Sequence, residues 1–393
     1  TLTITGAING ATIKADTTNF VDSILISQDA GTGTLSSASD NTGLGNDVFN
    51  VLTSAIRCTA VGSSAGAALT TASEATLIGR QAGLALTTGN SNTFIGARSG
   101  ASTTTGTENT AVGQGSLNVN STGGSNTALG RGALLSNTTA SNNTAVGRNS
   151  LNVNTTGTEH VAVGSLTLKA NTTGNYNTAV GYNALTTNTT GDENTAVGNS
   201  ALKANTTGEY NTALGLGSLQ NNTTASYNTA VGQTALYSNT TGANNTAVGY
   251  FALLVNTTGV NNTAVGHNSL DANTTGGLNT AVGSASLGSN TTGVENTAFG
   301  VSALTANTTA SYNTALGRSA LTTNTTGANN TAVGYDALNA NTTATGNTAV
   351  GHNSLVSNTT GAQQVAVGGS AMENNTTGYN NTAVGWESMK ANT

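Results

Sequence analysis

Proline is absent from this chain of 393 residues, and phenylalanine, tryptophan and tyrosine together make up only 4% of it. Charged residues are also scarce, at 7%, where an ordinary globular domain has about a quarter. Large globular cores and catalytic sites are built from these scarce residue types, whereas Asn, Thr, Gly, Ala, Val and Leu dominate here. The composition therefore predicts a repetitive array rather than a set of globular domains.

Concentrated charge and long apolar runs are missing as well. The net charge is −6 and the ten Lys and Arg residues form no basic run, so we expect no nucleic acid partner. No segment approaches the roughly 20 apolar residues of a membrane-spanning helix, so we expect no membrane partner. The single cysteine, Cys58, cannot form a disulfide within the chain. Because the first residue is Thr1 rather than Met, we expect further sequence upstream.

One glycine recurs every 17 residues from Gly45 to Gly385, which makes 21 glycines without an insertion or deletion. The unit reads NTAVGxxALxxNTTGxx, and its positions are numbered here from the Asn of NTAVG, so that the glycine is position 5. A period this strict indicates that each unit contacts the next in the same way. We interpret the glycines as structural, and the series includes Gly113, Gly130, Gly147, Gly181, Gly198, Gly249 and Gly385.

Two positions of the unit are apolar almost throughout. Position 4 is Val, Leu, Ile or Phe, and position 9 is Leu from Leu117 to Leu355. Strand alternation then predicts that positions 2 and 4 face inward and position 3 outward. The small residues at positions 3 and 8 are expected on the outside, where they would let another chain approach closely. Representative core predictions are Val112, Val180 and Val248 at position 4, with Leu117, Leu185 and Leu253 at position 9.

Position 12 is Asn in 17 successive units, but Leu in three earlier ones, at Leu52, Leu69 and Leu86. Exchange between Leu and Asn predicts an inward-facing site, where stacked amides can form a hydrogen-bonded ladder. The predicted ladder includes Asn137, Asn154, Asn171, Asn188 and Asn205.

These patterns predict an all-β fold, a parallel β-solenoid (β-roll) of 17-residue coils with about 21 coils. Each coil is expected to hold two short strands and two turns, and the whole to form a rod. We expect residues 1–40 to form an N-terminal cap or connector, residues 41–108 irregular early repeats, and residues 109–393 the regular array. Because the array stops in mid-unit, we expect it to continue beyond residue 393.

Titratable residues are too scattered to predict a catalytic site, an enzyme activity or a cofactor. His160 lies at position 1, while His267 and His352 share position 6 but stand five units apart, too far to share a metal ion. The one weak cation candidate is the acidic group Asp192, Glu193 and Glu209; a solvated turn is the alternative.

Aromatic rings gather at position 6. They are candidates for stacking against a glycan, and the alternative is that they cover neighbouring units. These residues are Tyr182, Tyr250, Tyr335 and Trp386.

The NTAVG units resemble the short glycine-ended repeats in the head domains of trimeric autotransporter adhesins, over residues 41–393. That resemblance implies a left-handed β-roll assembled as a trimer, although the unit here is longer by its NTTG turn. A lead-in of Asn19 to Ile26 (NFVDSILI), Gly33 to Ser36 (GTLS) and Asn41 to Gly45 (NTGLG) runs directly into the array. This arrangement is similar to tail-fibre and other appendage proteins of bacteriophages, and it implies a virion fibre.

The expected function is therefore the shaft of a phage tail fibre, a homotrimer that projects a host-attachment tip. Its expected partners are further copies of itself, other virion or surface proteins bound through residues 1–40, and a host cell-surface glycan or protein. A bacterial surface adhesin or extracellular filament is the alternative, and an ice-binding solenoid a minor one. If small outward residues form the trimer contact, Arg at Ala213 or Ala247 should disrupt assembly, whereas Arg at Lys203 or Tyr237 should be tolerated.

Overall fold

The computed structural model describes residues 7–8, 11–28 and 32–391. All of its named elements are β-strands, and no helix in the described part of the chain is long and apolar enough to cross a membrane. The chain divides into two compact units, residues 1–194 and residues 195–393. Both units have the same architecture.

The first unit begins with a hairpin. Strand β1 (Ala7–Ile8) pairs antiparallel with β2 (Ala11–Thr17), which in turn pairs antiparallel with β3 (Phe20–Ser27). Strand β3 then pairs in parallel with β4 (Ala38–Ser39) and β5 (Thr42–Leu44), so the hairpin covers the edge of the first coil. Parts of the predicted cap or connector lie outside the described residues, namely 1–6, 9–10 and 29–31.

Each later coil contributes one three-residue strand, at positions 2 to 4. In the first unit these are β6 (Thr59–Val61), β7 (Thr76–Ile78), β8 (Thr93–Ile95), β9 (Thr110–Val112), β10 (Thr127–Leu129), β11 (Thr144–Val146), β12 (Val161–Val163) and β13 (Thr178–Val180). In the second they are β14 (Thr195–Val197), β15 (Thr212–Leu214), β16 (Thr229–Val231), β17 (Thr246–Val248), β18 (Thr263–Val265), β19 (Thr280–Val282), β20 (Thr297–Phe299), β21 (Thr314–Leu316), β22 (Thr331–Val333), β23 (Thr348–Val350), β24 (Val365–Val367) and β25 (Thr382–Val384).

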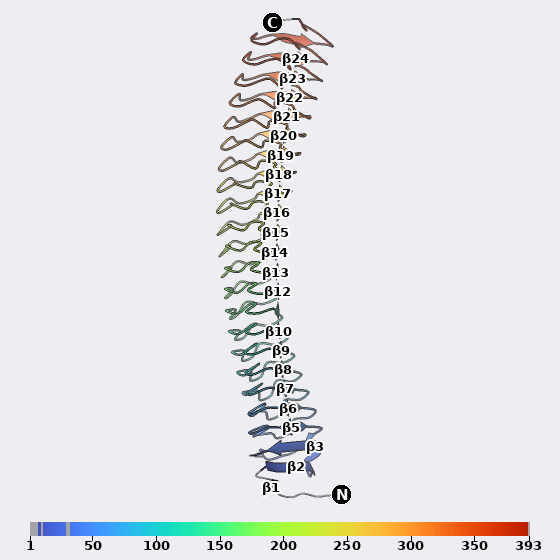
Figure 1. Cartoon of the computed structure of the whole chain (residues 1–393), viewed down its shortest axis with the longest axis vertical. Coiled ribbons are helices and arrows are strands. Elements are labelled where there is room, and N and C mark those ends of the chain that lie inside the picture. The colour runs from blue at the N-terminus through green and yellow to red at the C-terminus, as the bar shows by residue number, and fades with distance from the viewer. Residues whose placement is uncertain (1–6, 9–10, 29–31, 392–393) are drawn as a thin grey trace. The chain divides into compact units, whose positions relative to one another are not determined.

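Within each unit, successive strands pair in parallel and in register, so that residues 17 apart lie side by side. Figure 1 shows the coils stacked in this way, each strand label above the one before it. With nine such strands from β5 to β13 and twelve from β14 to β25, the predicted parallel β-solenoid of about 21 coils is confirmed.

The expected second strand of each coil does not form among the described residues, because tight turns replace it. The residues at positions 7, 9 and 17 have left-handed backbones, as in Asn268 (φ 53°), Leu253 (φ 51°) and Asn261 (φ 56°). Each of these amides donates to a neighbouring coil, to the carbonyls of Tyr250 (3.1 Å), Ser269 (3.0 Å) and Ala243 (3.1 Å) respectively. A left-handed residue costs roughly 1–2 kcal/mol. The hydrogen bond offsets a similar amount, because without it a buried amide would be unpaired.

The repeat glycine at position 5 is required by both conformation and space. Gly113 has a φ of +134°, and a Cβ there would lie 2.7 Å from the carbonyl carbon and oxygen of Gly130 on the next coil. No other residue type fits such a contact without moving the backbone. Position 15 is different, because Ala140 and Ala225 replace glycine there and their φ values are not positive, as the sequence predicts.

The interior of the coil is lined by positions 1, 3, 8, 9 and 12, so the prediction that the small residues at positions 3 and 8 face outward is wrong. Leu117, Leu185 and Leu253 at position 9 are fully buried, as expected. The prediction that position 4 belongs to the core is wrong. The residues concerned are Val112 and Val180, which are half-buried, and Val248, which is 36% exposed.

The physical reason is the width of the coil. The Leu at position 9 nearly fills the interior, so only a methyl group fits opposite it, and the strand turns its Ala at position 3 inward. Positions 2 and 4 must then face outward together. Ala213 and Ala247, predicted to be outward contacts, are fully buried, so Arg at either site would disrupt the coil itself.

Two coils near the start of the array carry their large core residue at position 3 instead of position 9. Leu77 and Phe94 occupy position 3 and are fully buried, while position 9 of the same coils is Gly83 and Gly100. A Cβ on Gly100 would lie 2.5 Å from the ring of Phe94, and one on Gly83 would lie 2.8 Å from Leu77 Cδ2. One large side chain therefore fills the space between positions 3 and 9, from either of the two positions.

The coil of residues 58–74 has a small residue on both walls, Ala60 at position 3 and Gly66 at position 9. Its interior is filled by its own Leu69 at position 12 together with side chains from the coils on either side. A Cβ on Gly66 would lie 2.7 Å from Leu77 Cδ1 of the next coil and 3.6 Å from Phe49 Cε1 of the preceding one. This coil thus depends on both neighbours for its packing.

The asparagines at position 12 form the predicted ladder. Asn137 Nδ2 donates to Asn120 Oδ1 (2.9 Å) and to the Ala140 carbonyl of its own coil (3.0 Å). The same pattern links the next members, Asn154, Asn171 and Asn188, in the first unit, and Asn222 to Asn205 in the second.

A second ladder, not predicted from the sequence, runs through position 1. Asn262 donates its backbone amide to Asn245 Oδ1 (2.9 Å) and its Nδ2 to the carbonyl of Gly276 (2.9 Å). The Gly276 carbonyl also accepts Asn273 Nδ2 from position 12 (2.9 Å), so two amides brace the coil at the same point. These buried side chains are hydrogen-bonded within and between coils, which gives a polar interior its stability.

Candidate functional site

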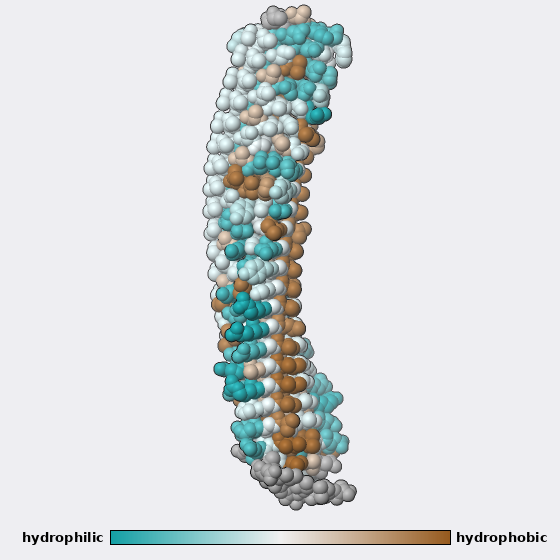
Figure 2. Space-filling model, viewed as in Figure 1, coloured by the Kyte–Doolittle hydropathy of each residue, from teal (hydrophilic) through white to brown (hydrophobic). Residues whose placement is uncertain are grey.

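One face of the sheet is solvent-facing and free of charge. It consists of the side chains at positions 2 and 4 of every coil and is called the outer sheet face below. Position 2 is Thr or Val and position 4 is Val, Leu, Ile or Phe, and within each unit these side chains form straight ranks because the strands pair in register. Exposure at position 4 reaches 46% at Leu214 and 53% at Phe299. Figure 2 shows a line of apolar surface along the coils that hold β5 to β12.

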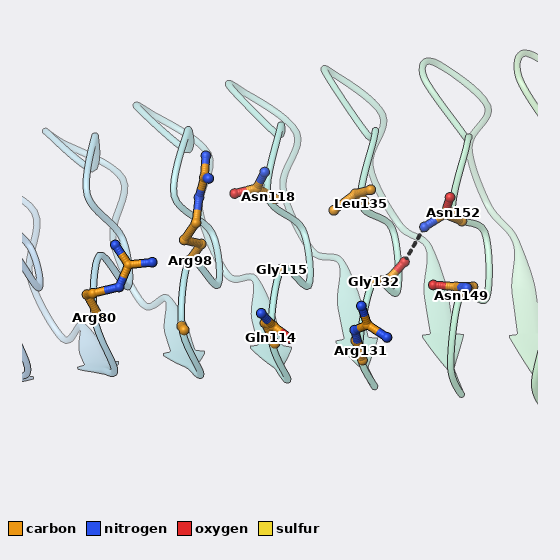
Figure 3. A pocket seen from close by; sticks show the side chains of 11 residues that line it. Arg80, Arg98, Gln114, Gly115, Asn118, Arg131, Gly132, Leu135, Asn149 and Asn152 are labelled. Carbon is orange, nitrogen blue, oxygen red and sulfur yellow. Dashed lines mark hydrogen bonds between the residues drawn. The ribbon is translucent and has the colours of Figure 1, made fainter.

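A basic hollow of about 320 Å³ lies beside the strands of the first unit. Three exposed arginines line it, Arg80 and Arg131 at position 6 and Arg98 at position 7. Figure 3 shows Arg80 and Arg98 on adjacent coils and Arg131 two coils further along, with Gln114 on the coil between. We call this site the arginine hollow. It was not predicted from the sequence, where its residues are separated by many others.

Side-chain amides complete the arginine hollow. Gln114 is exposed, whereas Asn118, Asn149 and Asn152 are half-buried. Asn152 Nδ2 donates to the Gly132 carbonyl (2.8 Å), as the dashed line in Figure 3 marks. The buried oxygen Asn118 Oδ1, by contrast, accepts no hydrogen bond. The lining thus offers positive charge and at least one unoccupied acceptor.

No carboxylate neutralises the arginine hollow. From residue 79 to residue 170, positions 6 to 11 contain no Asp or Glu. The acidic residues of these coils, such as Glu108 and Glu159, lie at position 17, before the strand rather than after it. Within the described part of the chain, neither Arg98 nor Arg131 has an ion-pair partner. The ion pair of this region, Arg57 to Glu74 at 2.8 Å, belongs to position 17.

The candidate glycan-stacking rings at position 6 are not gathered into one platform. Tyr182 and Trp386 are exposed, at 52% and 73%. Tyr250 and Tyr335 instead stack on the imidazole of the next coil, His267 at 5.6 Å and His352 at 5.5 Å between ring centroids. Both rings nevertheless remain exposed, at 41% and 44%, so each contacts the neighbouring coil on one side and solvent on the other.

The acidic group proposed to recruit a cation is divided between the two units. Asp192 and Glu193 belong to the first and Glu209 to the second. Asp192 Oδ1 accepts the backbone amide of Asn175 (2.6 Å), and the Glu209 amide donates to Ser226 Oγ (2.9 Å). No group of three His, Cys, Asp or Glu that could hold a metal ion occurs among the described residues.

His160 replaces asparagine in the position 1 ladder and is 1% exposed. Its amide donates to Asn143 Oδ1 (3.0 Å), and its Nδ1 accepts the Asn177 amide (3.2 Å). Burial lowers the pKa of His160 from 6.5 to about 4, although hydrogen bonds to the backbone of Gly174 and Asn177 and the charge of Asp192 oppose this. The imidazole is therefore neutral at pH 7.

The outer sheet face is thus an apolar surface, and the arginine hollow is a basic one. No protein-family model matches the sequence, and no curated protein matches it.

Proposed function

We propose that this chain is the shaft of a homotrimeric fibre, of the kind found in virion appendages such as phage tail fibres, and that its copies associate through the outer sheet face. The observation that supports this proposal is the continuous apolar row at position 4. Within each unit, this row is half-buried or exposed on a single chain in coil after coil. Contiguous apolar surface of this extent is typical of protein interaction sites.

A further copy of the same chain is the partner that fits. The row repeats once per coil, roughly every 4.8 Å. A ligand that covers it must present apolar groups at the same interval over many coils, which a parallel copy in register does. The threefold number comes from the resemblance to trimeric autotransporter heads.

The energy of such an interface accumulates along the chain. A valine such as Val248, 36% exposed, leaves about 50 Å² of apolar surface to bury, worth about 1 kcal/mol. Over the twelve coils of the second unit the sum is on the order of 10 kcal/mol before the cost of association is subtracted. Because every coil repeats the contact, a weak interaction per coil suffices for a stable shaft.

In this proposal the shaft projects an attachment tip, and residues 1–40 join it to other virion proteins. The hairpin of β2 and β3 supports such a junction, because it covers the first coil and carries the lead-in that resembles phage appendage proteins. A bacterial surface adhesin would use the same shaft in the same way.

Light scattering on the purified chain tests the association. We expect the mass of a trimer, and a monomeric mass at micromolar concentration with β-sheet circular dichroism intact would refute the proposal. Replacing Val231, Val248 and Val265 together with Lys should yield monomers that remain folded. The matched control places Lys at the exposed position 14 of neighbouring turns, and it should leave the trimer intact: Thr241, Thr258 and Thr275.

An ice-binding solenoid is a second candidate, and one observation favours it. The outer sheet face presents straight ranks of Thr and Val without a charge, as on Thr246 and Val248. Binding to ice would need this face free, whereas a trimer would bury it. Thermal hysteresis by a monomeric chain would support the ice-binding function, and its absence in a trimeric preparation would eliminate it.

A further inference from the structure

We propose that the arginine hollow binds a linear acidic glycan, a chain of sugars that carries carboxylate groups. This inference goes beyond the shaft function, and its failure would leave the association of chains untouched. It rests on the charge, spacing and hydrogen-bonding capacity of the hollow.

The charge of the hollow is unusual for this chain. Of the six arginines in the whole sequence, Arg80, Arg98, Arg131 and Arg148 all fall at positions 6 and 7 of the first unit. No carboxylate shares positions 6 to 11 with them between residues 79 and 170. Guanidinium groups pair with carboxylates through two parallel hydrogen bonds, so an uncompensated group of them favours a carboxylate ligand.

The spacing of these charges suits an extended ligand rather than a single ion. Arg80 and Arg148 are four coils apart, roughly 19 Å at the usual strand separation. Each arginine lies on its own coil, so the charges follow the direction in which the coils stack. A ligand with negative groups repeated along its length can meet several of them at once.

The amides of the hollow require hydroxyl groups as well as charge. Asn118 Oδ1 is buried and accepts no hydrogen bond. A carboxylate or phosphate cannot satisfy it, because those groups have no proton to donate, whereas a sugar hydroxyl can. Gln114, Asn149 and Asn152 add further amides beside the arginines. Negative charge together with hydroxyl donors describes an acidic sugar.

The residues that line the hollow include no aromatic ring. Single-stranded nucleic acids are usually held by stacking their bases on such rings, in addition to phosphate contacts. The hollow therefore lacks the element that would favour a nucleic acid over a glycan.

Calorimetric titration of the full chain tests the proposal. The probes are a hexamer of galacturonic acid, the neutral maltohexaose, and a single-stranded oligonucleotide of similar charge. We expect binding of the galacturonate hexamer, weakened by added salt, and no binding of maltohexaose. Binding of the oligonucleotide as tightly as the galacturonate would overturn the assignment and identify a general polyanion site instead.

Three variants locate the site. Arg98→Ala combined with Arg131→Ala should weaken galacturonate binding by about tenfold or more. Arg318→Ala is the matched control, since it removes a charge from position 6 of the second unit, where the arginine lies over the Tyr335 ring. Asn118→Leu removes the free acceptor but keeps the coil, because Leu135 and Leu254 occupy the same position 10.

Equal weakening by Arg318→Ala would show that overall charge rather than the hollow binds the glycan, and would refute the proposal. Unchanged binding in Asn118→Leu would refute the role of the hydroxyl acceptor. All variants should retain the circular dichroism of the wild-type chain, which separates loss of binding from loss of folding.

Discussion

At the scale of the residue, this fold depends on backbone conformations that few side chains adopt. Position 5 has a φ near +130° and touches the carbonyl of the next coil, while positions 7, 9 and 17 are left-handed without being glycine. The Leu at position 9 must therefore satisfy two demands, an unfavourable backbone and a filled interior. Neither demand is visible from the propensity of Leu, so the sequence could not predict this geometry.

The two glycine positions should respond differently to a methyl group. Gly283→Ala at position 5 should lower the free energy of unfolding by about 2 kcal/mol or more, because φ is +132° and the Cβ would lie 2.5 Å from the Gly300 oxygen. Gly276→Ala at position 15 should cost less than about 1 kcal/mol, because its φ is not positive and Ala occupies that position at Ala310 and Ala344. A Cβ on Gly276 would also lie close to the Gly293 oxygen, so the expected difference rests on backbone conformation rather than on space. Urea denaturation measures both, and equal losses would contradict this account.

His160 should make the first unit sensitive to acid. Its folded pKa of about 4 lies below the unfolded value of 6.5, so the unfolded chain binds a proton more readily. The contribution of neutral His160 to stability is complete above pH 6.5 and is lost as the pH falls towards 4, by about 3 kcal/mol in total.

His160→Asn restores the residue found at position 1 in neighbouring coils and should remove that loss. The measurement is the urea midpoint of both proteins between neutral pH and pH 4, with unfolding detected by circular dichroism. Because every other titratable group is shared, the difference between the two proteins isolates the histidine. If the urea midpoints of the two proteins changed with pH in the same way, burial would not destabilise the protonated form of His160.

At the scale of the coil, the space between positions 3 and 9 holds one large side chain, and a double-mutant cycle can measure this. Phe94→Ala should lower the free energy of unfolding by about 3 to 5 kcal/mol by leaving a cavity. Gly100→Leu alone should cost about 1 to 3 kcal/mol by overfilling the same space. The combination recreates a regular coil, so it should recover most of the loss, and strictly additive costs would disprove the exchange of bulk between the two walls.

The exchange of large and small residues between positions 3 and 9 also explains which features of the coil the sequence could predict. The period and the buried positions 9 and 12 follow from repetition alone. The orientation of the strand does not, because hydrophobicity alone predicts that Val at position 4 faces the core and that Ala at position 3 faces solvent. The signal that could have corrected this is that position 3 grows to Leu77 and Phe94 in the coils where position 9 shrinks to Gly83 and Gly100.

At the scale of the molecule, the stack should tolerate the loss of whole coils but not of fractions. Deleting residues 246–262 removes one coil of the second unit and joins equivalent positions. The shortened chain should fold with a slightly smaller dependence of unfolding free energy on urea, in proportion to the surface lost. Deleting residues 254–262 instead breaks the period and should abolish cooperative unfolding of the coils around it. Similar behaviour of the two deletions would contradict a stack of nearest-neighbour contacts.

The candidate sites also show that the stacking of coils brings together residues that are far apart in the sequence. Arg80, Arg98 and Arg131 are 18 and 33 residues apart in sequence, where they form no basic run. A period near 17 brings them to one side of the first unit, which only the coil geometry reveals. Conversely, Asp192 and Glu209 share position 16 in the sequence but belong to different compact units.

Near-identical coils create an ambiguity for a folding chain, because a coil can settle against the wrong neighbour with almost no loss of contact. The coil of residues 58–74 has no such freedom. With Ala60 and Gly66 facing its interior, the coil is filled only in part by its own Leu69, and it needs Phe49 on one side and Leu77 on the other. A misplaced neighbour would leave a void there, with a cost of several kcal/mol on the order of a deleted core side chain. This segment therefore gives the array a fixed origin, from which the interchangeable coils that follow are counted.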